Sequence, residues 1–219
     1  MRLERDATFR TVDGKELYYR YWPVEHGRPR GAILLFHRGH EHSGRIAHLV
    51  EELDLPDFAL FAWDARGHGR SPGSRGHSPS VATSVADVQA FVDHVADRHG
   101  FDVETIAVIG QSLGATLLAG WAHDYAPRIR AMVLAAPALR VKLYVPFARP
   151  ALRFMHAIRG DFVVNSFVNA RLLTDDQERI ASYESDPLIT RAISVGVLIG
   201  LHDLAARVVA DAAAITVPA

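Results

Sequence analysis

Apolar residues gather in four short runs within the first 140 positions of the chain. The runs cover residues 32–36, 58–63, 105–109 and 132–135, and each is apolar at almost every position. Continuous apolar runs of this length are typical of strands buried on both faces of a parallel sheet. Ahead of them, two alternating segments flank Asp13-Gly14, a dipeptide typical of hairpin turns. The pattern predicts a hairpin followed by four buried strands.

Helical periodicity fills the spaces between these runs. Apolar residues recur at helical spacing over residues 46–53 and over 81–95, and Gly100 stands just beyond the second segment as a stop signal. Strand and helix therefore alternate. This alternation predicts an α/β fold, with a mostly parallel sheet, right-handed crossovers and helices on both faces.

The pattern changes after residue 137. Residues 138–214 contain no convincing strand pattern. Thr174, with Gln177 three residues later, fits a capping box at a helix start, and apolar residues recur at helical spacing from Ile193 to Val208. We expect this segment to be a helical insertion.

Composition narrows the possible functions. Of 219 residues, 24 are Lys or Arg and 25 are Asp or Glu, a balance that argues against a nucleic-acid groove or a polybasic membrane anchor. The chain has no cysteine, which excludes disulfides, zinc–thiolate sites and cysteine nucleophiles. No apolar run approaches the ~20 residues of a membrane span, and residues 1–6 lack the apolar core of a signal peptide. We expect a cytoplasmic protein.

The strongest chemical signal is a G-x-S-x-G sequence, Gly110-Gln111-Ser112-Leu113-Gly114, between an apolar run and a helical pattern. A serine on such a tight turn is held in a strained backbone conformation, and Gly110 and Gly114 let the helix approach the strand closely. The Leu113 N–H then lies at a helix N-terminus, where it can stabilise an oxyanion. The context predicts Ser112 as a nucleophile.

Three further segments carry a family resemblance. They are His37-Arg-Gly-His-Glu-His-Ser-Gly-Arg45, Asp64-Ala-Arg-Gly-His-Gly-Arg-Ser71 and Tyr183-Glu-Ser-Asp-Pro-Leu188. Together with the G-x-S-x-G sequence, they resemble the α/β-hydrolase superfamily, in its branch of monoacylglycerol lipases and serine aminopeptidase-like proteins. The match runs from one end of the chain to the other.

The first of these segments is similar to the branch's loop His-Gly-x-Gly-Glu-His-Ser-Gly-Arg. By this resemblance the Gly39 N–H is the second oxyanion donor, beside that of Leu113. Arg38 departs from the pattern, which has glycine there. A bulky cation at this point could alter the loop backbone or narrow the acyl pocket.

The resemblance implies an α/β-hydrolase fold with three parts. Residues 1–137 are the N-terminal part of the core, residues 138–214 a helical cap, and residues 215–219 the lead-in to a further strand. In chain order, the family places its triad acid after that strand and its histidine after the last strand. The triad acid, the histidine and the last strands and helices are therefore expected outside this chain, as in a C-terminally truncated hydrolase, and we expect the 219 residues alone to be inactive.

The histidines after Ser112 are poor substitutes for the missing base. His123 lies eleven residues after Ser112 on the same predicted helix, a rise of ~16 Å, which is beyond hydrogen-bond reach. His156 and His202 fall in the cap, whose helices rarely hold a base at the ~3 Å required. Asp203, beside His202, is more simply a solvated helix residue.

Metal and nucleotide sites are not predicted. His37, His40 and His42 form a cluster, but their spacing matches no zinc motif, and the resemblance makes them loop-packing residues. The glycines that follow residue 66 lack the spacing of a dinucleotide-binding loop. We expect neither a metal nor a cofactor, and we expect the Asp64 carboxylate to brace its loop.

Two function hypotheses remain. The first is a serine hydrolase that cleaves carboxylic esters through an acyl-Ser112 intermediate and resembles monoacylglycerol lipases or lysophospholipases. Its substrate would be a small-molecule ester with an apolar acyl group. The alternative is a non-catalytic hydrolase-like binding domain, or the hydrolase part of a larger fusion protein.

Two apolar features bear on ligands and partners. Residues 143–147, 152–155 and 162–167 could line an acyl pocket or could pack on one another, and the sequence leaves both open. The strand Met132–Ala135 would be an unprotected sheet edge, which permits self-association.

Overall fold

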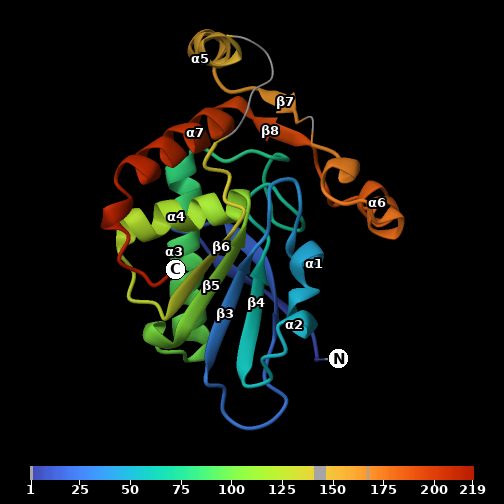
Figure 1. The fold of residues 1–219 in the computed structure, drawn as a ribbon, viewed down its shortest axis with the longest axis vertical. Coiled ribbons are helices and arrows are strands. Elements are labelled where there is room, and N and C mark those ends of the chain that lie inside the picture. Colours follow the sequence, from blue (N-terminus) through green and yellow to red (C-terminus); the bar gives the residue numbers. More distant parts are fainter. Residues whose placement is uncertain (1, 141–146, 167) are drawn as a thin grey trace.

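The computed structural model describes residues 2–140, 147–166 and 168–219. Its centre is a sheet with the strand order β1-β2-β4-β3-β5-β6 (Figure 1). The strands are β1 (Arg5–Arg10), β2 (Glu16–Trp22), β3 (Gly31–Phe36), β4 (Phe58–Trp63), β5 (Ile106–Gln111) and β6 (Ala131–Ala135). β1 and β2 form the predicted hairpin, and β4, β3, β5 and β6 run parallel. The predicted arrangement of the sheet is confirmed.

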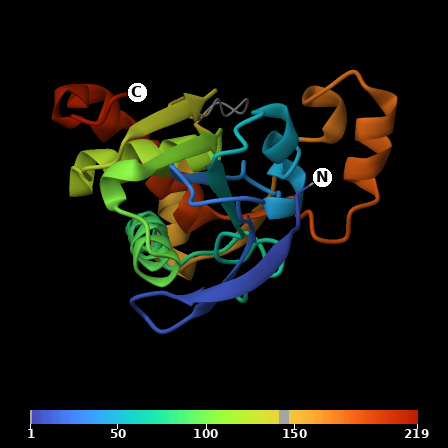
Figure 2. The ribbon, with the colours of Figure 1, turned by 90° about the horizontal axis from the view of Figure 1, so that it is seen from below.

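Helices cover both faces of this sheet, as Figures 1 and 2 show from two directions. α3 (Val81–His99), α4 (Leu113–Tyr125) and α7 (Val195–Ala210) lie on one face, and α1 (Ser43–Ile46) and α2 (Leu49–Glu52) lie on the other. The larger core lies under the first group, and a smaller apolar cluster lies under the second. A short turn of helix, η1 (Val103–Thr105), leads into β5. The fold is that of an α/β protein with a mostly parallel sheet.

The single helix expected over residues 46–53 is two short helices, α1 and α2. In a continuous helix, the Arg45 carbonyl would accept from the N–H four residues on. Here the carbonyl is 3.0 Å from the His48 Nδ1 atom instead. This local side-chain contact competes with the helical bond and separates the two helices.

The cap contains a small sheet that the sequence did not predict. The elements of the cap are α5 (Ala148–Arg159), β7 (Val163–Asn165), η2 (Ala170–Leu172), α6 (Gln177–Glu184), β8 (Ala192–Ser194) and α7, and η3 (Ala212–Ala214) follows them. β7 and β8 pair antiparallel. Strands of three residues are too short to show an alternating pattern, so the sequence predicted the helices of this insertion but not its short strand pair.

The start of α6 also differs from the prediction. Its N-cap is Asp176, whose carboxylate accepts from the N–H groups of Glu178 and Arg179. Thr174 instead accepts a hydrogen bond from the Asp176 N–H, so it belongs to the turn before the helix. An aspartate closer to the helix therefore displaces the predicted Thr174–Gln177 capping box.

α7 packs on the same core as the central sheet. Val197, Leu201, Leu204 and Val208 belong to the large apolar cluster. A Cβ built on Gly120 of α4 would lie 2.7 Å from the Leu204 side chain, so this glycine lets Leu204 pack directly against α4. The division of the chain at residue 138 stays a prediction.

β6 forms one edge of the central sheet. Val133 is 52% exposed there. The Met132 N–H donates to the Pro218 carbonyl at 2.8 Å, so the last residues of the chain lie beside the start of this strand. Among the described residues, no further strand pairs with the middle of β6.

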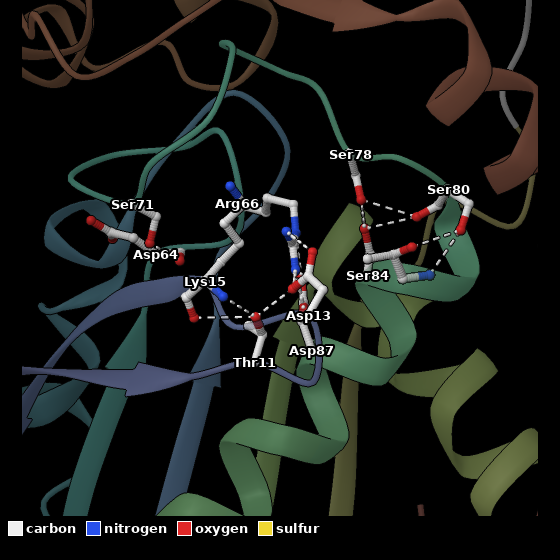
Figure 3. A network of polar contacts seen from close by, with 11 residues as sticks. Thr11, Asp13, Lys15, Asp64, Arg66, Ser71, Ser78, Ser80, Ser84 and Asp87 are labelled. Carbon is white, nitrogen blue, oxygen red and sulfur yellow. Dashed lines mark hydrogen bonds and ion pairs between the residues drawn. The ribbon is translucent and has the colours of Figure 1, made fainter.

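A buried arginine joins the hairpin to α3. The Arg66 guanidinium donates to both carboxylate oxygens of Asp87, at 2.8 and 2.9 Å, and to both of Asp13, also at 2.8 and 2.9 Å. Figure 3 shows the Arg66 guanidinium next to the Asp13 and Asp87 side chains. The Arg66 and Asp87 side chains are 7% and 4% exposed. Burial raises the pKa of Asp87, while Arg66 lowers the pKa of Asp13.

We predict that Arg66→Met lowers the free energy of unfolding by about 3 kcal/mol or more, because it leaves a buried carboxylate without its partner. Urea denaturation measures the loss. Arg10→Met is the matched control: its ion pair with Glu16 is exposed, so we expect a change below ~1 kcal/mol. Equal losses in the two variants would contradict the assigned role of Arg66.

Candidate active site

Ser112 stands between the end of β5 and the start of α4. Its φ and ψ are 53° and −110°, a combination that is strained for a residue with a side chain. The Ser112 N–H donates to the Ala135 carbonyl of β6 at 2.9 Å, and its own carbonyl accepts from the Thr116 N–H at 3.0 Å. The backbone has the strained strand-to-helix turn that the G-x-S-x-G sequence predicts.

The two glycines of the turn are required by close contacts. A Cβ on Gly110 would lie 2.7 Å from the Ala115 nitrogen, and a Cβ on Gly114 would lie 2.5 Å from the Phe36 carbonyl oxygen. Both distances are too short for any side chain. The first turn of α4 therefore lies directly on the ends of β5 and β3.

The two residues expected to supply the oxyanion donors, Gly39 and Leu113, lie beside each other. A Cβ built on Gly39 would be 3.4 Å from the Leu113 Cδ1 atom. Leu113 is the first residue of α4, where a backbone N–H has no partner within the helix. Gly39, Ser112 and Leu113 all line one cavity.

The loop of residues 37–45, called the His37–Arg45 loop here, is held from the core side by buried hydrogen bonds. The Asp64 carboxylate accepts from the Ser43 N–H at 2.6 Å and from the Arg70 N–H at 2.7 Å. The Ala65 N–H donates to His37 Nε2, so His37 carries its proton on Nδ1 and donates to the Arg38 carbonyl. The expectation that Asp64 braces its loop is confirmed.

The same loop is held from the cap side. The His42 imidazole accepts from the Gly44 N–H at Nδ1 and lies 3.0 Å from an Asp186 oxygen at Nε2. Arg45 donates to the Ser182 hydroxyl at 2.8 Å. The Thr190 N–H donates to the His40 carbonyl at 3.0 Å, which adds a third contact between loop and cap.

The His37–Arg45 loop contains a residue with a left-handed backbone conformation and a buried ion pair. His40 has a φ of 72°, in the left-handed region that favours glycine. Arg38 points its Nε atom at the buried Glu41 carboxylate, 2.7 Å away. Burial lowers the pKa of His40 to about 4 and raises the pKa of Glu41.

The cavity at Ser112, called the serine cavity here, has a volume of ≈ 460 Å³, within the usual range for small-molecule sites. Its apolar lining includes residues of the cap, namely Val164, Ile193, Leu198 and Leu201. Among the described residues of the three apolar stretches considered in the sequence, Val164 and its neighbours Asn165 and Ser166 contribute to it. Residues 152–155 lie on α5, where Phe154 is 67% exposed, and residues 143–146 lie outside the described part of the chain.

The histidines after Ser112 do not line the serine cavity. His123 lies between Asp124 and Asp211, His156 is near Asp161, and His202 contacts Arg149. Within residues 2–140, 147–166 and 168–219, no group of three His, Cys, Asp or Glu side chains could hold a metal ion. In the same ranges, no helix is both long and apolar enough to cross a membrane.

Comparison with known proteins places this geometry in a family. The family described as serine aminopeptidase, S33 (Hydrolase_4) matches residues 27–219. The chain belongs to this family. Its fold is the α/β-hydrolase fold, and the matching relatives and solved structures include lipases.

The chain covers different shares of the relatives that it resembles. It is 54% identical to the uncharacterized protein YnbC of Escherichia coli over 99% of its own length, but it spans only 37% of YnbC. It is 28% identical to the monoacylglycerol lipase of Mycolicibacterium smegmatis, covering 97% of this chain and 75% of the lipase. The crystal structure of Paleococcus ferrophilus monoacylglycerol lipase has a TM-score of 0.79 and 28% identity, with 93% of this chain and 75% of that chain covered.

The contact between His42 and Asp186 could not be read from the sequence of this S33 family member. Both residues lie in segments that carry the family resemblance, but 144 positions separate them. Their pairing depends on where the cap meets the core. The only sequence signal was that both segments match the same family.

Buried histidines make the stability of the fold sensitive to acid. Burial lowers the pKa of His37, and it lowers the pKa of His40, His68 and His99 to about 4. In the unfolded chain each would bind a proton near pH 6.5. Between pH 6.5 and 4.5 the unfolded state therefore holds more protons at these sites, and acidification favours unfolding.

We predict that the free energy of unfolding falls as the pH is lowered from 6.5 to 4.5, by up to about 1.4 kcal/mol per pH unit for each fully buried histidine. Glu41 and Asp87, whose pKa values burial raises, offset part of the loss. Urea titrations at several pH values measure the slope. His68→Gln should reduce this slope; a stability that is constant or rises on acidification would contradict the assignment.

Proposed function

We propose that this chain is the nucleophile-bearing part of a serine hydrolase that cleaves carboxylic esters with an apolar acyl group. The observation that carries the proposal is the strained backbone of Ser112 in one cavity with Gly39 and Leu113, the residues to which we assign the oxyanion donors. The apolar lining of the serine cavity suits an acyl chain. The names of relatives such as the Mycolicibacterium monoacylglycerol lipase support the same substrate class.

In the proposed reaction, the Ser112 hydroxyl oxygen attacks the ester carbonyl carbon as a base takes the hydroxyl proton. The negative charge that develops on the carbonyl oxygen is stabilised by the Gly39 and Leu113 N–H groups. The alcohol leaves with a proton, and the acyl group stays on Ser112. Water then attacks the acyl-enzyme, releasing the acid and restoring the serine.

We assign the base and its acid partner to residues outside these 219. His40 is the histidine that shares the serine cavity with Ser112. Its pKa of about 4 is low for a general base near neutral pH, and its backbone is part of the loop that carries Gly39. The proposal therefore concerns the full natural chain, and activity of the 219 residues alone is not expected. The cytoplasmic location expected from the sequence stays a prediction.

We predict that a fluorophosphonate probe adds once to the full natural chain and that Ser112→Ala abolishes the adduct, because the probe reacts with an activated serine hydroxyl. Intact-mass spectrometry measures the adduct. Ser166→Ala is the matched control, since Ser166 lines the same cavity and has no assigned role in the chemistry.

Two results would contradict this proposal. An adduct that persists in Ser112→Ala would place the nucleophile elsewhere. An unlabelled wild-type protein with native stability would favour the non-catalytic binding domain.

We also propose that the 219-residue chain self-associates through the open edge of β6. Unpaired strand edges are templates for pairing with another chain. Val133 is 52% exposed in the middle of that strand. A charge there should block pairing.

We predict that light scattering detects dimers or larger species of the 219-residue chain at high concentration and that Val133→Lys returns it to a monomer. Val12→Lys is the matched control, because Val12 is 89% exposed but lies outside the strands of the sheet. A wild-type chain that remains monomeric at all concentrations would refute the proposal.

A further inference from the structure

His40 differs from the other polar residues that line the serine cavity. The lining that the structure describes is mostly apolar, and its polar side chains include Arg140, Asn165 and Ser166, which are exposed or half-buried. His40 is only 8% exposed. A second cavity, between the His37–Arg45 loop and α6, does not include His40 in its lining. The imidazole is therefore a buried polar group on the wall of a mostly apolar space.

The backbone does not favour a histidine at this position. The φ of His40 is 72°, a value that glycine adopts without strain and that other residues rarely adopt. The loop pattern that residues 37–45 resemble has glycine at position 40 as well as at position 38. The imidazole is thus present at a position that glycine would occupy with less strain.

The imidazole of His40 has hydrogen-bonding capacity that the described residues leave unused. Its Nδ1 atom is buried and has no hydrogen-bond partner within the described ranges of the chain. Burial lowers the pKa of His40 to about 4, although the Thr190 backbone favours the proton, so the ring is neutral near neutral pH. A buried nitrogen without a partner destabilises a fold. Together with the left-handed backbone, it indicates a contact made with a ligand.

A hydroxyl is the group that best matches a neutral imidazole. One ring nitrogen of a neutral histidine is a donor and the other is an acceptor. A hydroxyl both donates and accepts, so it can pair with whichever nitrogen faces it, whereas an ammonium group only donates and a carboxylate only accepts. A neutral ring also offers a carboxylate no ionic attraction. The ring therefore favours a hydroxyl on an otherwise apolar ligand.

The place of His40 in the loop limits where that hydroxyl lies. His40 directly follows Gly39, to which we assign one oxyanion donor, and consecutive Cα atoms are ~3.8 Å apart. Its short side chain reaches atoms a few bonds from the ester carbonyl, and not the far end of an acyl chain. Val164, Ile193 and Leu198 line other parts of the same cavity. The hydroxyl therefore belongs on the acyl group, close to the carbonyl.

We propose that His40 is a specificity-determining residue and that the serine cavity takes 3-hydroxyacyl esters. The hydroxyl of the acyl group bonds to the His40 imidazole, and the rest of the acyl chain lies against the apolar wall. The inference rests on the proposed ester hydrolysis at Ser112 and names the acyl group of its substrate. His40 takes no part in the proton transfers of the reaction.

The test measures binding to the full natural chain by calorimetry, with methyl ketone analogues that have no ester to cleave. The probes are nonan-2-one, the two enantiomers of 4-hydroxynonan-2-one, and 9-hydroxynonan-2-one. One 4-hydroxy enantiomer, whose hydroxyl stands where a 3-hydroxyacyl ester has it, should bind about tenfold more tightly than nonan-2-one. The 9-hydroxy ketone should have no such advantage, because its hydroxyl would lie against the apolar wall.

His40→Gly should bring the affinities for the 4-hydroxy ketone and nonan-2-one to within about twofold of each other, because the imidazole is gone. Glycine suits a φ of 72°, so this variant should keep the urea midpoint of the wild type. His26→Gly is the matched control, since His26 is an exposed histidine that lines neither cavity. It should leave the ratio of affinities unchanged.

Equal affinity for nonan-2-one and both 4-hydroxy enantiomers would overturn the proposal. A preference that survives His40→Gly, or that extends to the 9-hydroxy ketone, would overturn it as well. Fluorophosphonate labelling of the same samples keeps the two hypotheses apart. A labelled protein without the hydroxyl preference refutes the role of His40 alone, and an unlabelled protein with the preference refutes the hydrolase proposal alone.

Discussion

The first turn of α4 lies so close to the end of β3 that no side chain fits between them. A Cβ at position 114 would stand 2.5 Å from the Phe36 carbonyl oxygen. Because the His37–Arg45 loop follows β3 directly, a helix that touches the last carbonyls of this strand also touches that loop. Ser112, Leu113 and Gly39 are brought to one place by this single contact.

The loop opposite the helix is fixed from two directions. Asp64 and His37 hold it to the turn after β4, and His42 and Arg45 hold it to the cap. A loop tethered on one side only could shift relative to the serine. With both tethers, the backbone around Gly39 is held in place beside Ser112, which is what the proposed role of Gly39 as an oxyanion donor requires.

The sequence predicted best those features that depend on residues close to one another in the chain. The turn at Ser112 depends on five consecutive residues, and Gly100 ends α3 in the left-handed conformation that a glycine stop signal implies. The start of α6 was mispredicted because Thr174 and Asp176 both have side chains that can cap a helix. Only the path of the backbone decides which of the two is the N-cap. The β7–β8 pair and the His42–Asp186 contact join distant segments, and no local pattern specifies which distant segments meet.

α7 is a cap element by its position in the chain but a core element by its packing. Leu204 lies against Gly120, and Arg207 donates to Asp124 of α4 at 2.9 Å. Leu198 and Leu201, which line the serine cavity, are therefore fastened to the helix that begins after the serine. Movement of this wall would disturb its packing on α4, so the width of the cavity on this side is set at folding, and we expect adjustment to ligands of different thickness at other lining residues, such as Val164, Asn165 and Val168.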